Sequence, residues 1–226
     1  MTKLLLAGAT GLVGTAVLKL LLADARVTRV VAPTRRSLPP HAKLLNPIAD
    51  STDMPYDADR WVTDAAICAL GTTRANAGSA AAYRAIDYDY ALAIATQVRR
   101  GGAKSFALTS SMGANARSRF RYTRTKGELE DAIARLGFPS LTIVRPGFLG
   151  GERSEYRRWE RTMSAVLRIA APILPAAART SPASIVAALL VEAALSGSPG
   201  RHIIDSTQIA RAAEVVAEGR VSISAF

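Results

Sequence analysis

Apolar and polar positions divide most of the chain into strand-sized apolar runs and segments of helical periodicity. The runs lie at residues 3–7, 27–32, 43–45, 65–70, 106–109 and 141–144. Between them, apolar residues recur at helical spacing over 12–22, 79–100 and 121–136. Continuous apolar runs are typical of strands buried on both faces, and their alternation with helices indicates a parallel sheet. The pattern therefore predicts an α/β fold with helices on both faces of the sheet.

Beyond residue 150 helical periodicity dominates, with arginines between the apolar positions around Trp159. The remaining expected elements are a helix at 183–195, a strand at 201–205 and a helix at 206–218. Since no linker or low-complexity segment interrupts this part, we predict a single domain over 1–226. Within it, residues 151–200 are expected to form a small C-terminal helical lobe on the substrate side.

A glycine-rich turn follows the first apolar run directly and opens the first helix, with glycines at 8, 11 and 14. In a dinucleotide site the first glycine permits the turn, the second lets the backbone approach the phosphates, and the third lets the helix pack closely. Free N–H groups and the positive end of the helix dipole then face the anion. We therefore predict a Rossmann-type, doubly wound sheet, with an ordinary strand–helix turn as the alternative. The expected pyrophosphate contacts are Gly8, Thr10, Gly11, Leu12, Val13 and Gly14.

Residues after the second apolar run favour a phosphorylated dinucleotide. An NAD site needs an acid about 20 residues beyond the glycines, but no acid stands between Asp24 and Asp50. Arg35 and Arg36 occupy this stretch and suit a 2′-phosphate. We predict NADP as the cofactor, with NAD, or a solvated arginine pair, as the alternative. Asp50 is expected either to accept a hydrogen bond from the adenine amino group or to cap a helix.

Tyr122 and Lys126 stand four residues apart on the helix that follows the fifth run. At this spacing both side chains lie on one helix face, where an ammonium favours the phenolate form of a nearby phenol. The tyrosine then serves as a proton donor or acceptor. Ser110 and Ser111 lie at the end of the fifth run, where a hydroxyl can hydrogen-bond the same substrate oxygen.

Together with Arg145-Pro146-Gly147, these motifs resemble the short-chain dehydrogenase/reductase superfamily, in its extended or atypical branch, over nearly the whole chain. The stretches around Leu70-Gly71 and Ser110 also resemble the HTATIP2/TIP30-like group of NAD(P)-binding oxidoreductases. The resemblance implies that Tyr122 is the general acid or base, that Lys126 hydrogen-bonds the nicotinamide ribose, and that Ser111 orients the substrate oxygen. The further cofactor contacts that it implies are Leu70, Gly71, Pro146 and Gly147.

Two departures from that family pattern bear on catalysis. Asp87 stands where many relatives have an asparagine that supports a proton relay, and the acid changes the local charge. The gap between Ser111 and Tyr122 is also shorter than is usual for the extended branch, which suggests a reduced substrate loop.

Charge and cysteine content restrict partners and compartment. The net charge of +11 favours anionic partners, but no basic block or recognisable nucleic-acid motif is present, so nucleic-acid binding is not expected. Cys68 is the single cysteine, which fits a reducing environment. Without a secretory signal or an apolar stretch of about 18 residues, we predict a cytoplasmic protein. His41 and His202 are isolated, so no metal site is expected.

The sequence therefore predicts an NADP-dependent oxidoreductase that acts on a small carbonyl or alcohol through Ser111, Tyr122 and Lys126. The alternative is an NADP-binding regulatory or assembly protein with little or no turnover. The substrate and the oligomeric state stay open, and the basic helix around Trp159 leaves contact with a membrane surface open.

Overall fold

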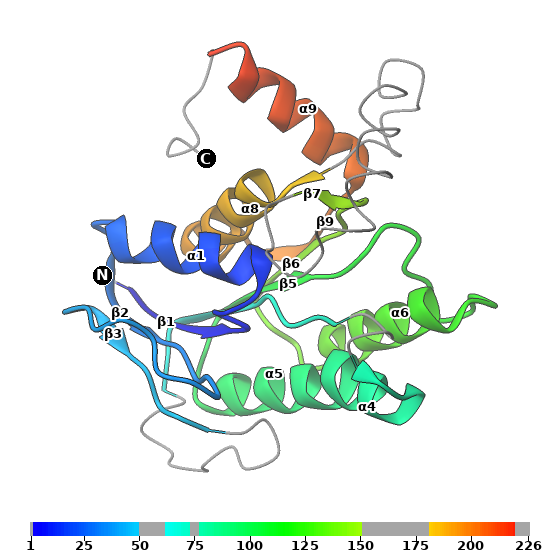
Figure 1. Ribbon diagram of the computed structural model, residues 1–226, viewed down its shortest axis with the longest axis horizontal. Helices are drawn as coiled ribbons and strands as arrows, with labels where there is room; N and C mark the ends of the chain where they lie inside the picture. Colours follow the sequence, from blue (N-terminus) through cyan, green and yellow to red (C-terminus); the bar gives the residue numbers. More distant parts are fainter. Residues whose placement is uncertain (1, 50–61, 73–76, 151–180, 220–226) are drawn as a thin grey trace.

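The computed structural model describes residues 2–49, 62–72, 77–150 and 181–219. A seven-stranded sheet, parallel throughout, forms its centre in the order β3-β2-β1-β4-β5-β6-β9 (Figure 1). Its strands are β1 (Thr2–Ala7), β2 (Val27–Val31), β3 (Leu44–Leu45), β4 (Ala65–Cys68), β5 (Ser105–Thr109), β6 (Ser140–Val144) and β9 (Gly200–Ile204). Two short strands, β7 (Leu149–Gly150) and β8 (Ser181–Pro182), pair with each other. The predicted α/β fold with a doubly wound parallel sheet is confirmed.

Helices cover both faces of this sheet. The helical segments are α1 (Leu12–Ala23), α4 (Ala80–Arg84), η1 (Ala85–Tyr90), α5 (Ala91–Arg100), α6 (Arg121–Ala134), α8 (Ala183–Ser196) and α9 (Ser206–Ala217). In Figure 1, α1 and α8 lie on one side of the sheet and α5 and α6 on the other. Because the strands are parallel, all of their carboxyl ends lie along one edge of the sheet, where ligands bind in such folds.

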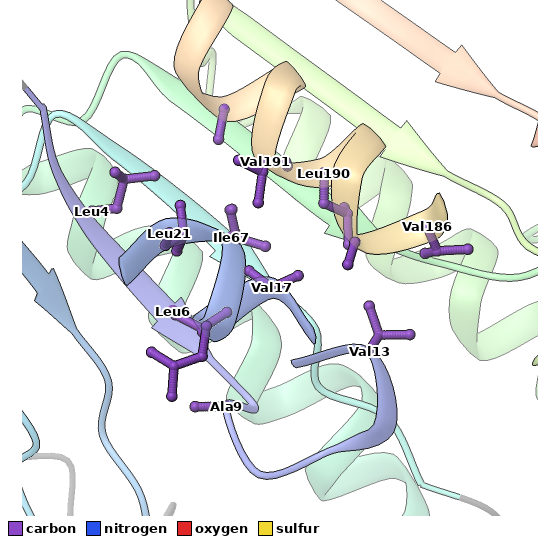
Figure 2. Packing of buried hydrophobic residues seen from close by; sticks show 14 of the residues in the cluster. Leu4, Leu6, Ala9, Val13, Val17, Leu21, Ile67, Val186, Leu190 and Val191 are labelled. Atoms are coloured by element: carbon purple, nitrogen blue, oxygen red, sulfur yellow. The ribbon is translucent and has the colours of Figure 1, made fainter. Parts of the chain in front are cut away.

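The two faces of the sheet have separate apolar cores, because successive side chains of a strand point to opposite sides. Along β1, Leu4 and Leu6 pack with α1 and α8 (Figure 2), whereas Leu5 packs with α5 and α6. Each of these three leucines is 1% exposed or less. This double burial explains why the strands read as continuous apolar runs in the sequence.

The predicted long helix over 79–100 is interrupted by a turn of π-helix. Ser79 caps its start as expected, accepting a hydrogen bond from the Ala82 N–H at 3.0 Å. The helix then changes to the wider π-helical form in η1 and continues as the α-helix α5. No glycine or proline marks the change in the sequence. The π-turn contains Asp87, whose side chain is buried, and π-turns occur often at functional sites.

The C-terminal elements complete the central fold. Helix α8 contributes Ile185, Val186, Leu190 and Val191 to the core that it shares with α1, and β9 extends the sheet beyond β6. Residues 151–180 of the predicted substrate-side lobe, with Trp159, lie outside the described residues. Within the described part of the chain, no helix has the length and apolar composition needed to cross a bilayer.

Candidate functional site

The glycine turn joins β1 to α1 without room for side chains. Gly8 has φ +84°, a conformation that favours glycine. A Cβ on Gly14 would lie 1.9 Å from the Gly8 carbonyl oxygen, so α1 approaches the turn as only a glycine permits. Gly11 caps the helix without a side-chain hydrogen bond, and the first turn of α1 holds no acid. The first-turn N–H groups of this helix end are therefore suited to an anion.

The other residues expected at this turn differ in exposure. Thr10 is exposed and Leu12 is half-buried. The Val13 side chain is 4% exposed and packs in the core with α8 (Figure 2). Only the backbone of Val13 is therefore placed to contribute to an anion site.

Arg35 and Arg36 lie beyond the carboxyl end of β2 and are exposed. Thr34 pairs with Ile48 through the backbone, and its hydroxyl donates to the Arg36 carbonyl oxygen at 2.6 Å. Among the described residues, no carboxylate lies within ion-pair distance of either guanidinium. As far as the described residues go, both guanidinium groups are therefore available to an anion. Asp50, the expected adenine contact, lies outside the described residues.

A buried ion pair joins α6 to η1. Lys126 Nζ lies 2.7 Å from Asp87 Oδ1, and the two side chains are 4% and 0% exposed. The other carboxylate oxygen, Asp87 Oδ2, accepts a hydrogen bond from the Thr72 N–H at 2.8 Å. Burial lowers the pKa of Lys126, but the Asp87 carboxylate and Tyr122 raise it, and the net change is upward from 10.5. The lysine is therefore a charged group whose charge is already matched.

The loop after β4 connects this ion pair to the glycine turn. A Cβ on Gly8 would lie 2.7 Å from the Ala69 carbonyl carbon and 2.9 Å from Leu70 N. Further along the same loop, a Cβ on Gly71 would lie 3.8 Å from both Asp87 Oδ1 and Lys126 Nζ. The structure thus brings Gly8, Leu70, Gly71 and Lys126 into one continuous region at the carboxyl edge of the sheet.

Tyr122 and Ser111 lie at the ends of the segment between β5 and α6. Tyr122 is 47% exposed on the first turn of α6, and Ser111 is 6% exposed. The Ser111 hydroxyl is buried and has no hydrogen-bond partner in the part of the chain that the structure describes. A Cβ on Gly127 would lie 2.2 Å from the Ala116 N atom, so this short segment packs directly against the α6 backbone.

The segment after β6 is tied to both sides of this region. The Pro146 carbonyl accepts the Met112 N–H at 2.8 Å, and the Gly147 N–H donates to the Ser181 hydroxyl at 3.1 Å. Arg145, just before them, donates from Nε to the buried Glu130 carboxylate at 3.0 Å. Pro146 and Gly147 are thereby fixed beside the residues that follow β5.

Sequence reasoning missed three residues of this region: Tyr83, Gly127 and Glu130. Glu130 accepts hydrogen bonds from both Ser110 and Arg145. It stands four residues after Lys126, so the spacing that singles out Tyr122 and Lys126 also places Glu130 on the same helix face. Tyr83 and Asp87 show this spacing too. The backbone contact of Gly127 has no local signal, because it depends on how the preceding loop folds back.

Comparison with known proteins identifies relatives for most of the chain. The family model HIM1 matches residues 62–170. Protein fmp52, mitochondrial, from Emericella nidulans is 39% identical over 171 residues, which cover 70% of this chain and 71% of the relative. Protein FMP52, mitochondrial, from Lodderomyces elongisporus is 41% identical over 169 residues, covering 68% and 69%. The solved structure of MoeE5 in complex with UDP-glucose and NAD superposes with a TM-score of 0.69 at 15% identity, covering 95% of this chain and 82% of MoeE5.

The predicted cytoplasmic location is contradicted by these relatives, which are named as mitochondrial proteins. The prediction relied on Cys68 and on the lack of a recognisable secretory signal or membrane-spanning stretch. A single cysteine indicates a reducing environment, but it does not say which reducing compartment holds the protein.

The predicted Rossmann-type fold, by contrast, is confirmed, since the chain superposes on MoeE5. The identity and coverage shared with the fungal relatives then define the family more narrowly. The chain belongs to the FMP52 family.

Proposed function

We propose that the chain is a nicotinamide-dependent oxidoreductase that acts on a small carbonyl or alcohol. The observation that carries this proposal is the continuity of the carboxyl edge. The glycine turn abuts the loop after β4 at Ala69, and the same loop borders Lys126 at Gly71. A dinucleotide with its pyrophosphate at Gly8–Gly14 therefore has a path toward the residues on α6. MoeE5, which shares the fold, is described in complex with NAD.

The residues present fit such a cofactor. The turn at Gly8 and the close approach at Gly14 leave the first-turn amides of α1 available to phosphate oxygens. Gly71 is exposed and has no side chain to cover the Lys126 ammonium. When bound, a nicotinamide supplies hydride exchange with the substrate carbon.

The chain's own residues supply the proton chemistry in this proposal. The half-exposed Tyr122 hydroxyl gives its proton to the substrate oxygen during reduction, or takes it back during oxidation. The Ser111 hydroxyl, which has no other partner, orients that oxygen. Lys126 uses a donor that Asp87 does not occupy to hydrogen-bond the ribose.

We further propose that NADP is preferred to NAD. Arg35 and Arg36 are exposed beyond β2 and have no carboxylate partner within the described residues. Guanidinium groups in this state suit the 2′-phosphate that distinguishes the two dinucleotides.

A binding experiment tests the preference for NADP over NAD. Binding of NADPH and NADH is measured by nucleotide fluorescence for the wild type and for the double variant Arg35→Ser/Arg36→Ser. We expect the double variant to lose about tenfold or more in NADPH affinity, because charge-assisted hydrogen bonds are lost, with NADH affinity nearly unchanged. Arg29→Ser, at an exposed position of β2, is the matched control. Equal losses for both nucleotides would remove the argument for NADP.

Turnover is then followed as NADPH oxidation across a panel of small carbonyl compounds. Tyr122→Phe is expected to abolish the rate while leaving NADPH affinity intact, because only the proton donor is lost. A reductase activity that survives in this variant would contradict the role given to Tyr122.

A second candidate function has one specific observation in its favour. Because the charge of Lys126 is matched by Asp87, the ammonium stabilises a phenolate less than an unpaired ammonium does. This supports a protein that binds the dinucleotide for a regulatory or assembly role with little turnover. Tight NADPH binding without oxidation across the panel would favour this function.

A further inference from the structure

Helix α6 and the α4–η1 segment each carry a tyrosine and a charged residue that face those of the other segment. Tyr122 and Lys126 stand four residues apart on α6, and Tyr83 and Asp87 stand four residues apart across α4 and η1. The Tyr83 and Tyr122 ring centroids lie 6.0 Å apart with an interplanar angle of 38°. The Asp87 carboxylate lies 2.7 Å from the Lys126 ammonium. Phenol therefore faces phenol, and carboxylate faces ammonium.

The carboxylate changes what Lys126 does for Tyr122. An unpaired ammonium four residues from a phenol favours the phenolate by its full charge. Here the buried Asp87 carboxylate opposes that field, because it lies against the ammonium and both are shielded from solvent. A neutral hydrogen-bond donor beside Tyr122 would then help to stabilise the negative charge that Tyr122 acquires when it releases its proton.

Tyr83 has the properties that this task requires. The residue is 4% exposed, and its hydroxyl is buried without a hydrogen-bond partner among the described residues. Burial raises the pKa of Tyr83 well above its ordinary value of 10, and the charges of Asp87 and Tyr122 raise it further. Tyr83 therefore keeps its proton and stays a hydrogen-bond donor. A buried donor without an acceptor is unusual in a folded protein and calls for an explanation.

We propose that Tyr83 is a positioning residue for Tyr122, whose phenolate oxygen accepts a hydrogen bond from the Tyr83 hydroxyl. This inference rests on the proposed role of Tyr122 as proton donor. When Tyr122 protonates the substrate oxygen, its own O–H bond breaks and an O–H bond forms on the substrate. The Tyr83 O–H bond stays intact and donates to the new negative charge. The hydroxyl that lacks a partner beforehand thus gains one when the phenolate forms.

Several ionisable groups near Asp87 and Tyr83 are already engaged or buried within the described residues. Asp87 and Lys126 pair with each other. On β4, the fully buried Cys68 thiol has its pKa raised to about 11 by burial, so it stays neutral. Arg84, next to Tyr83, pairs with Glu128 at 2.7 Å on the more exposed side of the helices. None of these groups is a neutral donor held against the Tyr122 ring.

The test is an ultraviolet titration of phenolate absorbance, which needs neither cofactor nor substrate. Subtracting the titration of Tyr122→Phe from that of the wild type isolates the Tyr122 transition. The same subtraction in the Tyr83→Phe background should give a midpoint about one pH unit higher, which is tenfold in the ionisation constant. Tyr88→Phe is the matched control, because this phenol lies on the adjoining π-turn but contacts Arg84, and it should not move the midpoint.

Two further readouts make the outcome decisive. Tyr83→Phe should unfold at the same temperature as the wild type or higher, because the hydroxyl that it removes has no partner in the free protein. Where turnover is measurable, its kcat should fall about tenfold at neutral pH with KM nearly unchanged. An unmoved phenolate midpoint, or a clearly lowered unfolding temperature, would overturn the proposal. A moved midpoint in a protein without turnover would support the coupling of the two phenols and count against the oxidoreductase function alone.

Discussion

The two faces of the sheet are built from different chemistry. On the face covered by α1 and α8, the buried cluster consists of apolar side chains, among them Leu4, Val17 and Leu190. On the face covered by α5 and α6 lie all three charged residues that are buried within the described part of the chain, Asp87, Lys126 and Glu130. The apolar face needs only complementary shapes, whereas the polar face must pair every charge that it buries.

This difference separates the parts of the molecule that hold it together from the parts suited to chemistry. Burying an ion pair gains little stability compared with apolar packing, because both charges lose their hydration. The ion pair of Asp87 and Lys126 is therefore better explained by what it does at the carboxyl edge than by stability. If that is correct, the two faces should respond differently to substitution.

The largest effect on stability is expected when the buried ion pair is broken by Asp87→Asn. The variant keeps an oxygen that can accept the Thr72 N–H, but it leaves the Lys126 ammonium buried without a counter-charge. We expect the free energy of unfolding to fall by about 3–5 kcal/mol, measured by urea unfolding at neutral pH.

The exposed pair of Arg84 and Glu128 is the control for this experiment. Its side chains are 48% and 33% exposed, so Arg84→Gln should cost less than about 1 kcal/mol. Equal effects of Arg84→Gln and Asp87→Asn would show that burial of the second pair has no energetic consequence.

The pH dependence of the free energy of unfolding gives a second test of the Asp87→Asn prediction. In the wild type the folded-state pKa of Lys126 lies above 10.5, so its contribution to stability is complete below pH 10.5 and is lost as pH rises through that higher value. In Asp87→Asn, burial lowers the pKa without a carboxylate to oppose it. Stability of the variant should then rise with pH up to 10.5, and the gap to the wild type should narrow between pH 7 and pH 10.

A smaller and different effect is expected on the apolar face. Leu190 on α8 is fully buried against α1 (Figure 2), so Leu190→Ala should lower the free energy of unfolding by about 3 kcal/mol through lost packing. NADPH affinity at temperatures well below unfolding should stay unchanged, because the Leu190 side chain lies within the apolar core. A loss of affinity larger than the loss of folded protein would show that this face is not separate from the site.

The elements of the fold were predictable because their signals are local. The apolar runs of β1, β4, β5 and β6, the glycine turn and the Ser79 cap all depend on neighbouring residues, and each is found where the sequence places it. The late strand at 201–205 was also predicted, and it forms the edge of the sheet as β9. Because the central strands are buried on both faces, they appear in the sequence as continuous apolar runs. They could therefore be predicted without knowing which strands pair with them.

The pairing of Asp87 with Lys126 was not predictable, because it joins helices 39 positions apart through a π-turn that no glycine or proline announces. The sequence marked Asp87 as a departure from its relatives, but it did not show which charge the acid meets. For the same reason Tyr83 escaped notice, since its importance comes from the ring that faces it. The predicted roles of Ser111, Tyr122 and Lys126 stay predictions that the experiments above test.

The smallest effect on stability, and the finest test of the polar face, is expected from Gly71→Ala. The added Cβ would lie 3.8 Å from both Asp87 Oδ1 and Lys126 Nζ, which is ordinary van der Waals contact, and Gly71 does not have a positive φ. Stability should change by less than about 1 kcal/mol, in the favourable direction, because alanine restricts the unfolded chain. The methyl group nevertheless covers the side of the Lys126 ammonium from which the proposed cofactor approaches. NADPH affinity should therefore fall about tenfold. Gly101→Ala, at the end of α5 with φ −70°, adds the same methyl group away from the carboxyl edge and should leave affinity unchanged. If Gly71→Ala binds NADPH as tightly as the wild type, Lys126 is not approached from this loop, and the buried ion pair serves the fold rather than the cofactor.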